Sequence, residues 1–399
     1  GAYPGAPEAA LVIDHLSSDG VTSFAADFGD PLLTALGDDR PHGIFIDSLE
    51  LIGDLPWTAD LRATFADQFG YDLTPYLPLL FRQSGESKYV TLFDPEPPRP
   101  IYSTEFGERV REDYEDLRAR LFAEQFVQPV STWASDNDLQ LRLQAHGGWG
   151  QVLDDYAAAH IPEAEGLYAG GSYDFLKLAS SAAHVAGRPI ASSESFVAFV
   201  ASPDAITLDD LYLLAGRALS AGINRFIQHG HPYPLTQDSG SWYPFELPGI
   251  PFSASTRLSS DSPLWPELPA FNRYLARLSY IMTRGQHRAQ VAWLLADREI
   301  PDRSVLNLAG FPPEEGESAL TLALKRGGYV HDRISRQGLL MAEAQDGVLT
   351  IGSASYRALL IDDLQAASVE LMEQLIEVAD AGVPIIVLGD LPQRARGFR

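Results

Sequence analysis

The chain has 399 residues, of which 45% are hydrophobic and 21% charged, so it can bury a large core and is too long for one compact domain of ordinary size. Its 54 acidic and 29 basic residues give a net charge of −25, which repels phosphate backbones and makes nucleic acid a poor partner. The absence of cysteine excludes disulfides, thiolate metal sites and thiol catalysis.

No apolar run of about eighteen residues predicts a membrane span, and no charged and then apolar leader opens the chain, so we expect a soluble protein that does not act in a membrane. The composition fits a bacterial protein of the cytoplasm or an exported one alike. The compartment and the oligomeric state are therefore left open.

From residue 11 to about 285, short apolar runs alternate with longer amphipathic stretches, a pattern typical of βα units that form a parallel sheet. We expect strands at 11–15, 43–47, 139–145, just before Glu163, at 189–194 and at 224–229. Helices are expected at 60–69, 108–128, 173–186, 208–220 and 266–281. Because each strand precedes a helix, right-handed crossovers predict a barrel or a doubly wound sheet.

Polar residues of the types used in catalysis stand where these strands end. They are Asp47, Glu50, His146, Glu163, Glu165, Glu194, His229 and His231. Their convergence from several strands favours a (β/α)8 TIM-type barrel at 1–285, with its site at the carboxyl-terminal face. About six barrel strands can be counted where closure needs eight. We therefore expect one or two βα units upstream of Gly1, or a weak strand that the pattern does not reveal.

After Tyr280 the pattern changes to short strands at 291–295, 358–361 and 384–388, with a helix at 368–379. This predicts a flavodoxin-like α/β domain over 286–399, which we expect to be truncated because such a sheet normally continues. The stretch 83–104, rich in Pro, Ser and Glu, is expected to form a long loop over the barrel mouth.

Residues 43–50, GIFIDSLE, are the most informative stretch, because an apolar strand runs directly into two carboxylates. A strand that is apolar on both faces is typical of a buried parallel sheet. Strict alternation sends Asp47 and Glu50 to opposite faces, so a shared pocket requires the strand to end near Ser48. We favour a functional pair over the alternative in which Asp47 caps a helix and Glu50 faces solvent.

Glutamates also follow two later strands. Glu194 lies in the serine-rich stretch 192–195, whose hydroxyls can orient a carboxylate or a sugar. Glu163 and Glu165 follow Pro162; a site role and a surface role stay open for Glu163, and Glu165 is favoured less because glutamates are mostly exposed. Glycoside hydrolysis needs one carboxyl as proton donor and a second to activate water or attack the sugar, and such a cluster supplies that pair.

His146 and His229 each close a predicted strand. A neutral imidazole there can bind a sugar hydroxyl or orient a carboxylate, and a buried histidine bonded to the backbone is an equal alternative. His229 and His231 in HGH could form a metal motif, but metal-dependent hydrolases of this architecture usually need further strand-end ligands. We therefore disfavour a transition metal.

Aromatic residues in predicted loops support a sugar ligand, because flat rings suit the C–H faces of pyranoses. They are Trp57, Trp149, Trp242, Tyr243 and Trp265. Each of them alone could equally be a packing residue.

Seven blocks, in order, resemble the α-L-rhamnosidases of glycoside hydrolase family 106 over roughly residues 5–300. They are LVIDHLS at 11–17, GIFIDSLE at 43–50, FGYDLTPYLPLL at 69–80, LQAHG at 143–147, IPEAEG at 161–166, SSES at 192–195 and NRFIQHGHPY at 224–233. The order and spacing make this resemblance more specific than any single motif.

The resemblance implies a (β/α)8 barrel, hydrolysis of terminal α-L-rhamnose with inversion, and a calcium ion near the vicinal hydroxyls of the sugar. It implies a catalytic constellation of Glu50 and Glu194 with Asp47 beside them, and it matches Glu163 to a further acid, with Glu165 as a nearby alternative. The calcium ligands do not carry over, because no run as diagnostic as an EF-hand loop is present. Members of the family are usually longer, with upstream strands and β-rich domains that this chain lacks.

We therefore hypothesise an inverting exo-glycosidase with Glu50 and Glu194 as acid and base, their carboxyls separated by roughly 6.5 to 9.5 Å. A retaining β-galactosidase-like enzyme is the main alternative, although Pro162 stands before Glu163 where such enzymes typically have asparagine. A catalytically silent sugar-binding barrel is the other, and the retained acids count against it.

Overall fold

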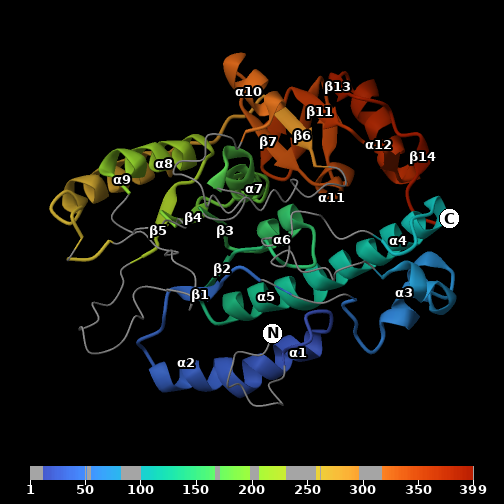
Figure 1. Ribbon diagram of the computed structural model, residues 1–399, viewed down its shortest axis with the longest axis horizontal. Coiled ribbons are helices and arrows are strands. Elements are labelled where there is room, and N and C mark those ends of the chain that lie inside the picture. The colour runs from blue at the N-terminus through green and yellow to red at the C-terminus, as the bar shows by residue number, and fades with distance from the viewer. Residues whose placement is uncertain are drawn as a thin grey trace. The chain divides into compact units, whose positions relative to one another are not determined.

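The computed structural model describes residues 12–49, 51, 55–81, 100–166, 171–197, 206–230, 258–260, 262–295 and 317–398 (Figure 1). The chain divides into two compact units. Unit 1 consists of residues 1–160, 364–373 and 390–399, and unit 2 of residues 161–363 and 374–389.

Unit 1 is mainly helical. Its helices are α1 (Ser18–Phe24), α2 (Asp30–Leu36), α3 (Leu61–Phe69), α4 (Glu105–Phe122), α5 (Gln128–Asp136) and α6 (Val152–Ala158), with a 3-10 turn at Thr74–Leu79. The hydroxyl of Thr104 caps α4 by accepting a hydrogen bond from the Gly107 amide. The buried side of α4 carries Val110, Leu117 and Phe122, as the three- and four-residue spacing predicts.

The helix expected at 108–128 does not stop there but continues through a π-helical turn, Ala123–Val127, into α5. Pro129 lies in the first turn of α5, where its missing amide hydrogen costs least. The π turn replaces the α-helical hydrogen bonds between α4 and α5, so the two helices follow one another without a loop.

Two parallel strands of unit 1, β1 (Gly43–Ile46) and β2 (Gln140–Leu143), pair with Ile44 beside Leu141. The prediction that β1 is buried on both faces is wrong, because Phe45 is 41% exposed. Within the described part of unit 1, β2 is the one strand that pairs with β1. The Arg142 guanidinium lies over the Phe45 ring, 4.0 Å from its centroid, and shields it in part.

The strand expected at 11–15 is absent from the described residues 12–15. The side chain of Asp14 instead accepts hydrogen bonds from the Leu16 amide and the Thr58 hydroxyl. Aspartate commonly stabilises such a turn by bonding to the backbone two residues on, so the segment turns directly into α1.

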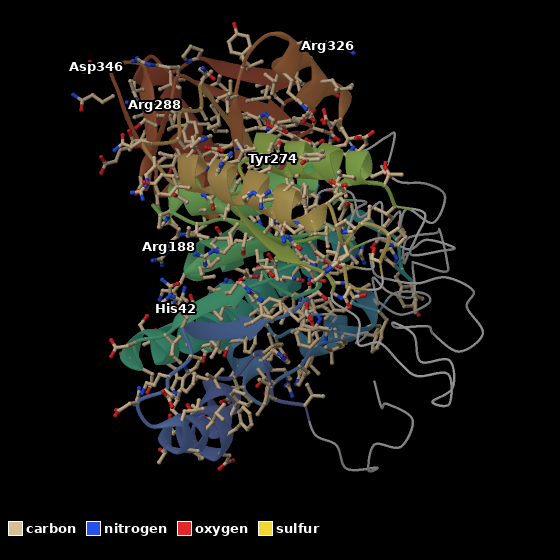
Figure 2. The ribbon with its side chains drawn as sticks, turned by 90° about the vertical axis from the view of Figure 1, so that its left-hand side faces the viewer. His42, Arg188, Tyr274, Arg288, Arg326 and Asp346 are labelled. Atoms are coloured by element: carbon tan, nitrogen blue, oxygen red, sulfur yellow. The ribbon has the colours of Figure 1, made fainter. Side chains whose placement is uncertain are left out.

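Unit 2 begins with three parallel strands, β3 (Ile161–Glu165), β4 (Ser192–Ser195) and β5 (Arg225–Gln228), which pair in that order. The helices of this part are α7 (Tyr173–Val185), α8 (Leu208–Ser220) and α9 (Leu268–Met282). A reciprocal capping box between Thr207 and Asp210 starts α8. Tyr274 of α9 (Figure 2) packs edge-on against Tyr212 of α8, with ring centroids 4.9 Å apart.

Unit 2 also contains a four-stranded parallel sheet of spatial order β13-β11-β6-β7. These strands are β6 (Val291–Leu294), β7 (His331–Ile334), β11 (Ala358–Asp362) and β13 (Ile385–Leu388). One face packs through Val291, Trp293 and Leu360 against Leu320 and Leu324 of α10 (Ala319–Arg326).

An antiparallel meander, β8 (Glu343–Gln345), β9 (Val348–Ile351) and β10 (Ala354–Tyr356), follows α11 (Arg336–Leu340). Helix α12 spans Val369–Asp380, and β12 (Ala366–Ala367) pairs with β14 (Arg394–Ala395) in unit 1. Within the described ranges, no helix is both long and apolar enough to span a bilayer.

Candidate active site

Three glutamates lie on one face of the β3–β4 pair. Glu163 and Glu165 are two positions apart on β3 and therefore point to the same side. The register places Glu163 beside Ser192 and Glu165 beside Glu194 on β4, and Ser192 and Glu194 are again two positions apart. All four side chains thus share what we call the acidic face, defined by Glu163, Glu165, Ser192 and Glu194.

The opposite face of β3 and β4 carries small side chains and no ionisable group, so all the glutamates of these strands lie on the other side. Ala164, Ser193 and Phe226 are register neighbours on that opposite face. Phe226 packs against a buried cluster that includes Phe196, Leu211 and Phe271. Because helices α8 and α9 supply Leu211 and Phe271, this face is covered and the acidic face is left for chemistry.

Glu163 is fully buried and receives a hydrogen bond from Ser192. The Ser192 hydroxyl lies 2.6 Å from the Glu163 Oε2 atom, and both residues are 0% exposed. A buried carboxyl is stable only with such a partner, so the register of β3 and β4 determines where this carboxylate lies.

Glu194 is more accessible. Its side chain is 16% exposed, and its Oε1 atom lies 4.0 Å from Nε2 of His229, whose side chain is 31% exposed. The two residues stand at the carboxyl ends of neighbouring strands, since the His229 amide donates to the Ser195 carbonyl. An imidazole at this distance can orient or charge-balance the carboxylate.

The chain leaves β4 through an uncommon backbone conformation. Phe196 has a φ of 68°, in the left-handed region that bulky residues rarely adopt, and its ring is 1% exposed within the apolar cluster. Burial of the ring offsets the strain of that conformation. The turn that follows Glu194 is therefore fixed by packing.

In unit 1, two predicted site residues are described. Asp47 is exposed just after β1, and its Oδ1 atom accepts a hydrogen bond from the Ser48 amide. His146 follows β2 but is only 4% exposed, with Nδ1 3.3 Å from the Tyr156 hydroxyl. The Leu49 amide donates to the carbonyl of His146, so the segments after β1 and β2 run side by side.

Several predicted residues lie outside the described part of the chain. They are Glu50, His231, Trp242 and Tyr243. The separation between the carboxyls of Glu50 and Glu194 therefore stays a prediction, as does most of the loop at 83–104.

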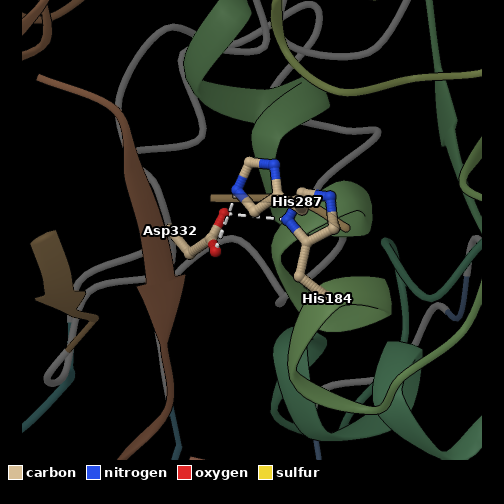
Figure 3. Close-up of side chains that lie close together, drawn as sticks. All are labelled: His184, His287 and Asp332. Atoms are coloured by element: carbon tan, nitrogen blue, oxygen red, sulfur yellow. Dashed lines mark hydrogen bonds and ion pairs between the residues drawn. The ribbon is translucent and has the colours of Figure 1, made fainter. Parts of the chain in front are cut away.

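A second polar cluster in unit 2, His184, His287 and Asp332, was not predicted from the sequence (Figure 3). The Asp332 carboxylate is 0% exposed and lies 3.0 Å from His184 Nδ1 and 3.3 Å from His287 Nε2. Lys177 Nζ is also 2.9 Å from Asp332. Burial lowers the pKa of His184 to about 4, so its ring is neutral near pH 7. In the sequence, the polar run HDRI at 331–334, which forms β7, is the feature that points to this cluster.

The geometry of this cluster suits hydrogen bonds better than a metal ion. The rings of His184 and His287 are stacked with centroids 3.5 Å apart and an interplanar angle of 12°. Because an imidazole lone pair lies in the ring plane, one ion cannot lie in both of these nearly parallel planes. The ammonium of Lys177 beside the carboxylate would also repel a cation.

Comparison with solved structures finds similar folds in three proteins. A rhamnosidase from Novosphingobium sp. PP1Y superposes with a TM-score of 0.71 at 21% identity, over 99% of this chain and 36% of that chain. A β-galactosidase from the Antarctic haloarchaeon Halorubrum lacusprofundi gives 0.57 at 13% identity, over 93% and 56% of the two chains. A β-galactosidase from Bacillus circulans sp. alkalophilus gives 0.53 at 12% identity, over 93% and 55%.

At these identities the similarity shows the fold alone, which is a mixed α/β fold with parallel strands, consistent with a TIM-like fold. The chain spans about a third of the length of the rhamnosidase that it matches. A search of curated proteins gave no match. A family model described as alpha-L-rhamnosidase matches residues 2–398, and the chain therefore belongs to glycoside hydrolase family 106.

Proposed function

We propose that the protein is an α-L-rhamnosidase that removes terminal rhamnosyl residues from glycosides or polysaccharides. The observation that carries the proposal is the acidic face in a chain of this family, where Glu163, Glu165 and Glu194 share one face of two parallel strands and Glu165 lies at the carboxyl end of β3. Paired carboxyls at such a position are what glycoside cleavage requires. A neutral sugar also suits a protein with a net charge of −25.

In the proposed mechanism, Glu50 and Glu194 act as the acid and base, with the order of the two roles open. The protonated carboxyl gives its proton to the glycosidic oxygen as the bond to the anomeric carbon breaks. The ionised carboxyl removes a proton from a water molecule, whose oxygen attacks the anomeric carbon from the opposite side. The products are free rhamnose of inverted configuration and the alcohol, and a proton exchange with water restores the enzyme.

The remaining predicted residues have supporting roles in this proposal. His229, 4.0 Å from Glu194, orients that carboxylate or a sugar hydroxyl. Asp47, Glu163 and His146 complete the polar lining, and His231 and Trp242 are proposed to contact the sugar.

The activity is tested with nitrophenyl α-L-rhamnoside, and nitrophenyl β-galactoside serves as the comparison substrate. We expect hydrolysis of the rhamnoside and a loss of turnover of about 10³-fold or more in E194Q, because a catalytic carboxyl is removed. The exposed Glu377 of α12 provides a control, E377Q, which should keep full activity. Preference for the galactoside would contradict the proposal, and so would binding without hydrolysis, the result expected of a silent sugar-binding barrel.

The stereochemical outcome is tested by proton NMR of the first product formed. Inversion predicts that β-L-rhamnose appears first from an α-linked substrate and then mutarotates. If α-L-rhamnose appears first, the mechanism is retaining. One of the two carboxyls must then act as the nucleophile and the other as both acid and base.

We also propose that the site binds a calcium ion, and the donor chemistry of the acidic face fits it, since calcium prefers carboxylate oxygens. The acid/base assignment leaves Glu163 and Glu165 on this face, and Glu163 already accepts the Ser192 hydrogen bond, so Glu165 is the proposed ligand of the ion. The ion would bind the vicinal hydroxyls of the sugar and so orient the ring. Chelation followed by calcium addition should lower and then restore both the thermal midpoint and the affinity for rhamnose; no change in either would contradict a calcium site.

We further propose that the chain is organised as a catalytic barrel at 1–285 and a flavodoxin-like domain at 286–399. Numbered along the chain from β6, the sheet β13-β11-β6-β7 has the order 4-3-1-2. This matches the doubly wound order 2-1-3-4, read from the other edge. Limited proteolysis should cut between the two regions, near residues 283–289, and protection of that stretch would contradict the boundary.

A further inference from the structure

We infer that Ser192 is a positioning residue that holds the Glu163 carboxylate in its working orientation. The inference rests on the proposed function, because Glu163 belongs to the site only if the acidic face does. Ser192 would not touch the substrate; it would act through Glu163.

The contact itself is short and fully enclosed. The Ser192 hydroxyl oxygen lies 2.6 Å from Glu163 Oε2, within the range of a hydroxyl that donates to a carboxylate. Neither residue has any exposed surface. Water therefore cannot replace the hydroxyl without a rearrangement of the strands, and the hydrogen bond keeps its full strength.

The register of the sheet makes this contact specific. Ser192 is the register neighbour of Glu163, and both side chains point to the acidic face. The neighbouring hydroxyls bind backbone carbonyls instead. Ser193 donates to the carbonyl of Glu194 at 3.1 Å, and Ser195 donates to the carbonyl of Ser193 at 3.0 Å. Among the described contacts of these three serines, only that of Ser192 joins a carboxylate.

A positioning role is useful because two other carboxyls share the face on which Glu163 lies. Glu165 lies on the same side of β3, and Glu194 lies on the same side of β4. Repulsion from an ionised neighbour favours an orientation of the Glu163 side chain that turns away from these carboxyls. The Ser192 hydroxyl provides a fixed donor that holds it, and an error of about 1 Å in such a group can reduce turnover about 10²-fold.

The test compares S192A with S193A in steady-state hydrolysis of nitrophenyl α-L-rhamnoside. S192A should lower kcat about 10- to 100-fold and leave KM within about threefold, because the Ser192 hydroxyl orients the Glu163 carboxylate beside the proposed catalytic Glu194 and does not itself touch the sugar. S193A removes an equally buried hydroxyl from the same strand and should stay within about twofold of the parent. S192T, which keeps the hydroxyl, should recover most of the lost kcat.

A second readout does not depend on activity. Infrared difference spectra against E163Q isolate the carboxylate stretch of Glu163, and we expect this band to shift in S192A and to stay unchanged in S193A. If S192A does not fold, S192C keeps the shape with a much weaker donor and should give the same shift.

An unchanged band together with an unchanged kcat in S192A would overturn the inference, and so would an equal loss of kcat in S193A. A shifted band in a protein that hydrolyses no rhamnoside would instead confirm the contact while refuting the proposed function. The two failures are thus distinguishable.

Discussion

Lys177 and Asp332 form an almost completely buried ion pair, with the Lys177 Nζ atom 2.9 Å from Asp332 Oδ1 and side chains that are 1% and 0% exposed. The Tyr356 hydroxyl donates to the other carboxylate oxygen at 3.2 Å. Burial alone would raise the pKa of Asp332, but Lys177 and the hydrogen bonds from His184 and His287 hold it well below its usual value. The carboxylate thus connects α7, β7 and β10 within unit 2.

We expect D332N to lower the free energy of unfolding by about 3–5 kcal/mol, because it leaves the Lys177 ammonium buried without its counter-charge. Urea unfolding at pH 7 measures this loss. D380N, at the exposed end of α12, should change stability by less than about 0.5 kcal/mol. In K177M/D332N the cost should be well below the sum of the single variants; strict additivity would show that the two side chains do not stabilise each other.

The acidity of Asp332 also sets a pH dependence. Its pKa is lower in the folded than in the unfolded state, so its contribution is fully present above about pH 4 and is lost as the pH falls toward the folded pKa. D332N should therefore lose less stability than the parent on acidification in this range.

Much of the backbone was predictable from short patterns. The apolar runs gave β1 to β6, β11 and β13, and the amphipathic stretches gave α7 and α8 to within one residue at each end. These elements have strong local signals: period-two or continuous apolar residues, and caps such as Thr207 with Asp210. Helix boundaries were least certain where the helix propensity of the sequence continues past the end of a helix, as between α4 and α5.

The features that were not predicted share one physical cause, because each depends on residues far away in the sequence. Strand β7 reads HDRI, a polar run that no hydrophobic pattern detects, and it is buried only because Lys177 and other side chains neutralise Asp332. Phe45 was expected to be buried, and its exposure depends on which elements cover its face of β1. The pairing of Ser192 with Glu163 requires the strand register, which one sequence does not contain.

A second prediction concerns Glu112 on α4, which anchors the chain after β14. Arg394 makes a bidentate pair with the Glu112 carboxylate, at 2.5 and 2.9 Å, and the Gly397 amide donates to it at 2.9 Å. Burial raises the pKa of Glu112, but the hydrogen bonds from Arg394 and Gly397 outweigh it and lower that pKa overall.

We expect E112Q to lower the free energy of unfolding by about 1–3 kcal/mol, since charge-assisted hydrogen bonds are lost in a mostly buried site. Glu108 provides a matched control on the same helix, because it lies 3.8 Å from Arg394 but is 58% exposed. E108Q should cost less than about 1 kcal/mol. Equal losses in thermal or urea unfolding would show that burial and geometry do not distinguish the two pairs.

A third prediction concerns Asp155, a buried carboxyl in α6. Neither of its oxygens has a hydrogen-bond partner among the residues that the structure describes, and it is 0% exposed. It packs so tightly against Gly150 that a Cβ atom there would lie 1.9 Å from Oδ2. Burial, with a smaller effect from Asp154, raises its pKa well above the usual value.

Because the folded state holds the Asp155 proton more tightly, stability falls as the pH rises from about 4 toward the raised pKa. D155N keeps the shape without the ionisable proton and should raise the free energy of unfolding at pH 7 by roughly 1–3 kcal/mol. The gain should vanish near pH 3.5, and D136N at the exposed end of α5 should show none. A gain that is equal at both pH values would contradict the assignment to ionisation.

The last prediction concerns His331 in β7, which is 0% exposed and has no hydrogen-bond partner for either ring nitrogen among the described residues. Its ring lies 5.3 Å from Trp293 and 6.1 Å from Tyr173, centroid to centroid. Burial, reinforced by the charges of Lys177 and Arg333, lowers its pKa to about 3. The ring is therefore packed as a neutral, largely apolar group.

Since an unfolded histidine titrates near 6.5, the parent should lose stability as the pH falls below that value, by up to about 1.4 kcal/mol per pH unit from this residue. H331L should be nearly as stable as the parent at pH 7, because no hydrogen bond is lost, and should lose less on acidification to pH 4. The exposed His42 (Figure 2) is the control, because its ring is solvated in both states, so H42L should track the parent. Parallel stability curves for H331L and the parent would contradict the lowered pKa of His331 in the folded state.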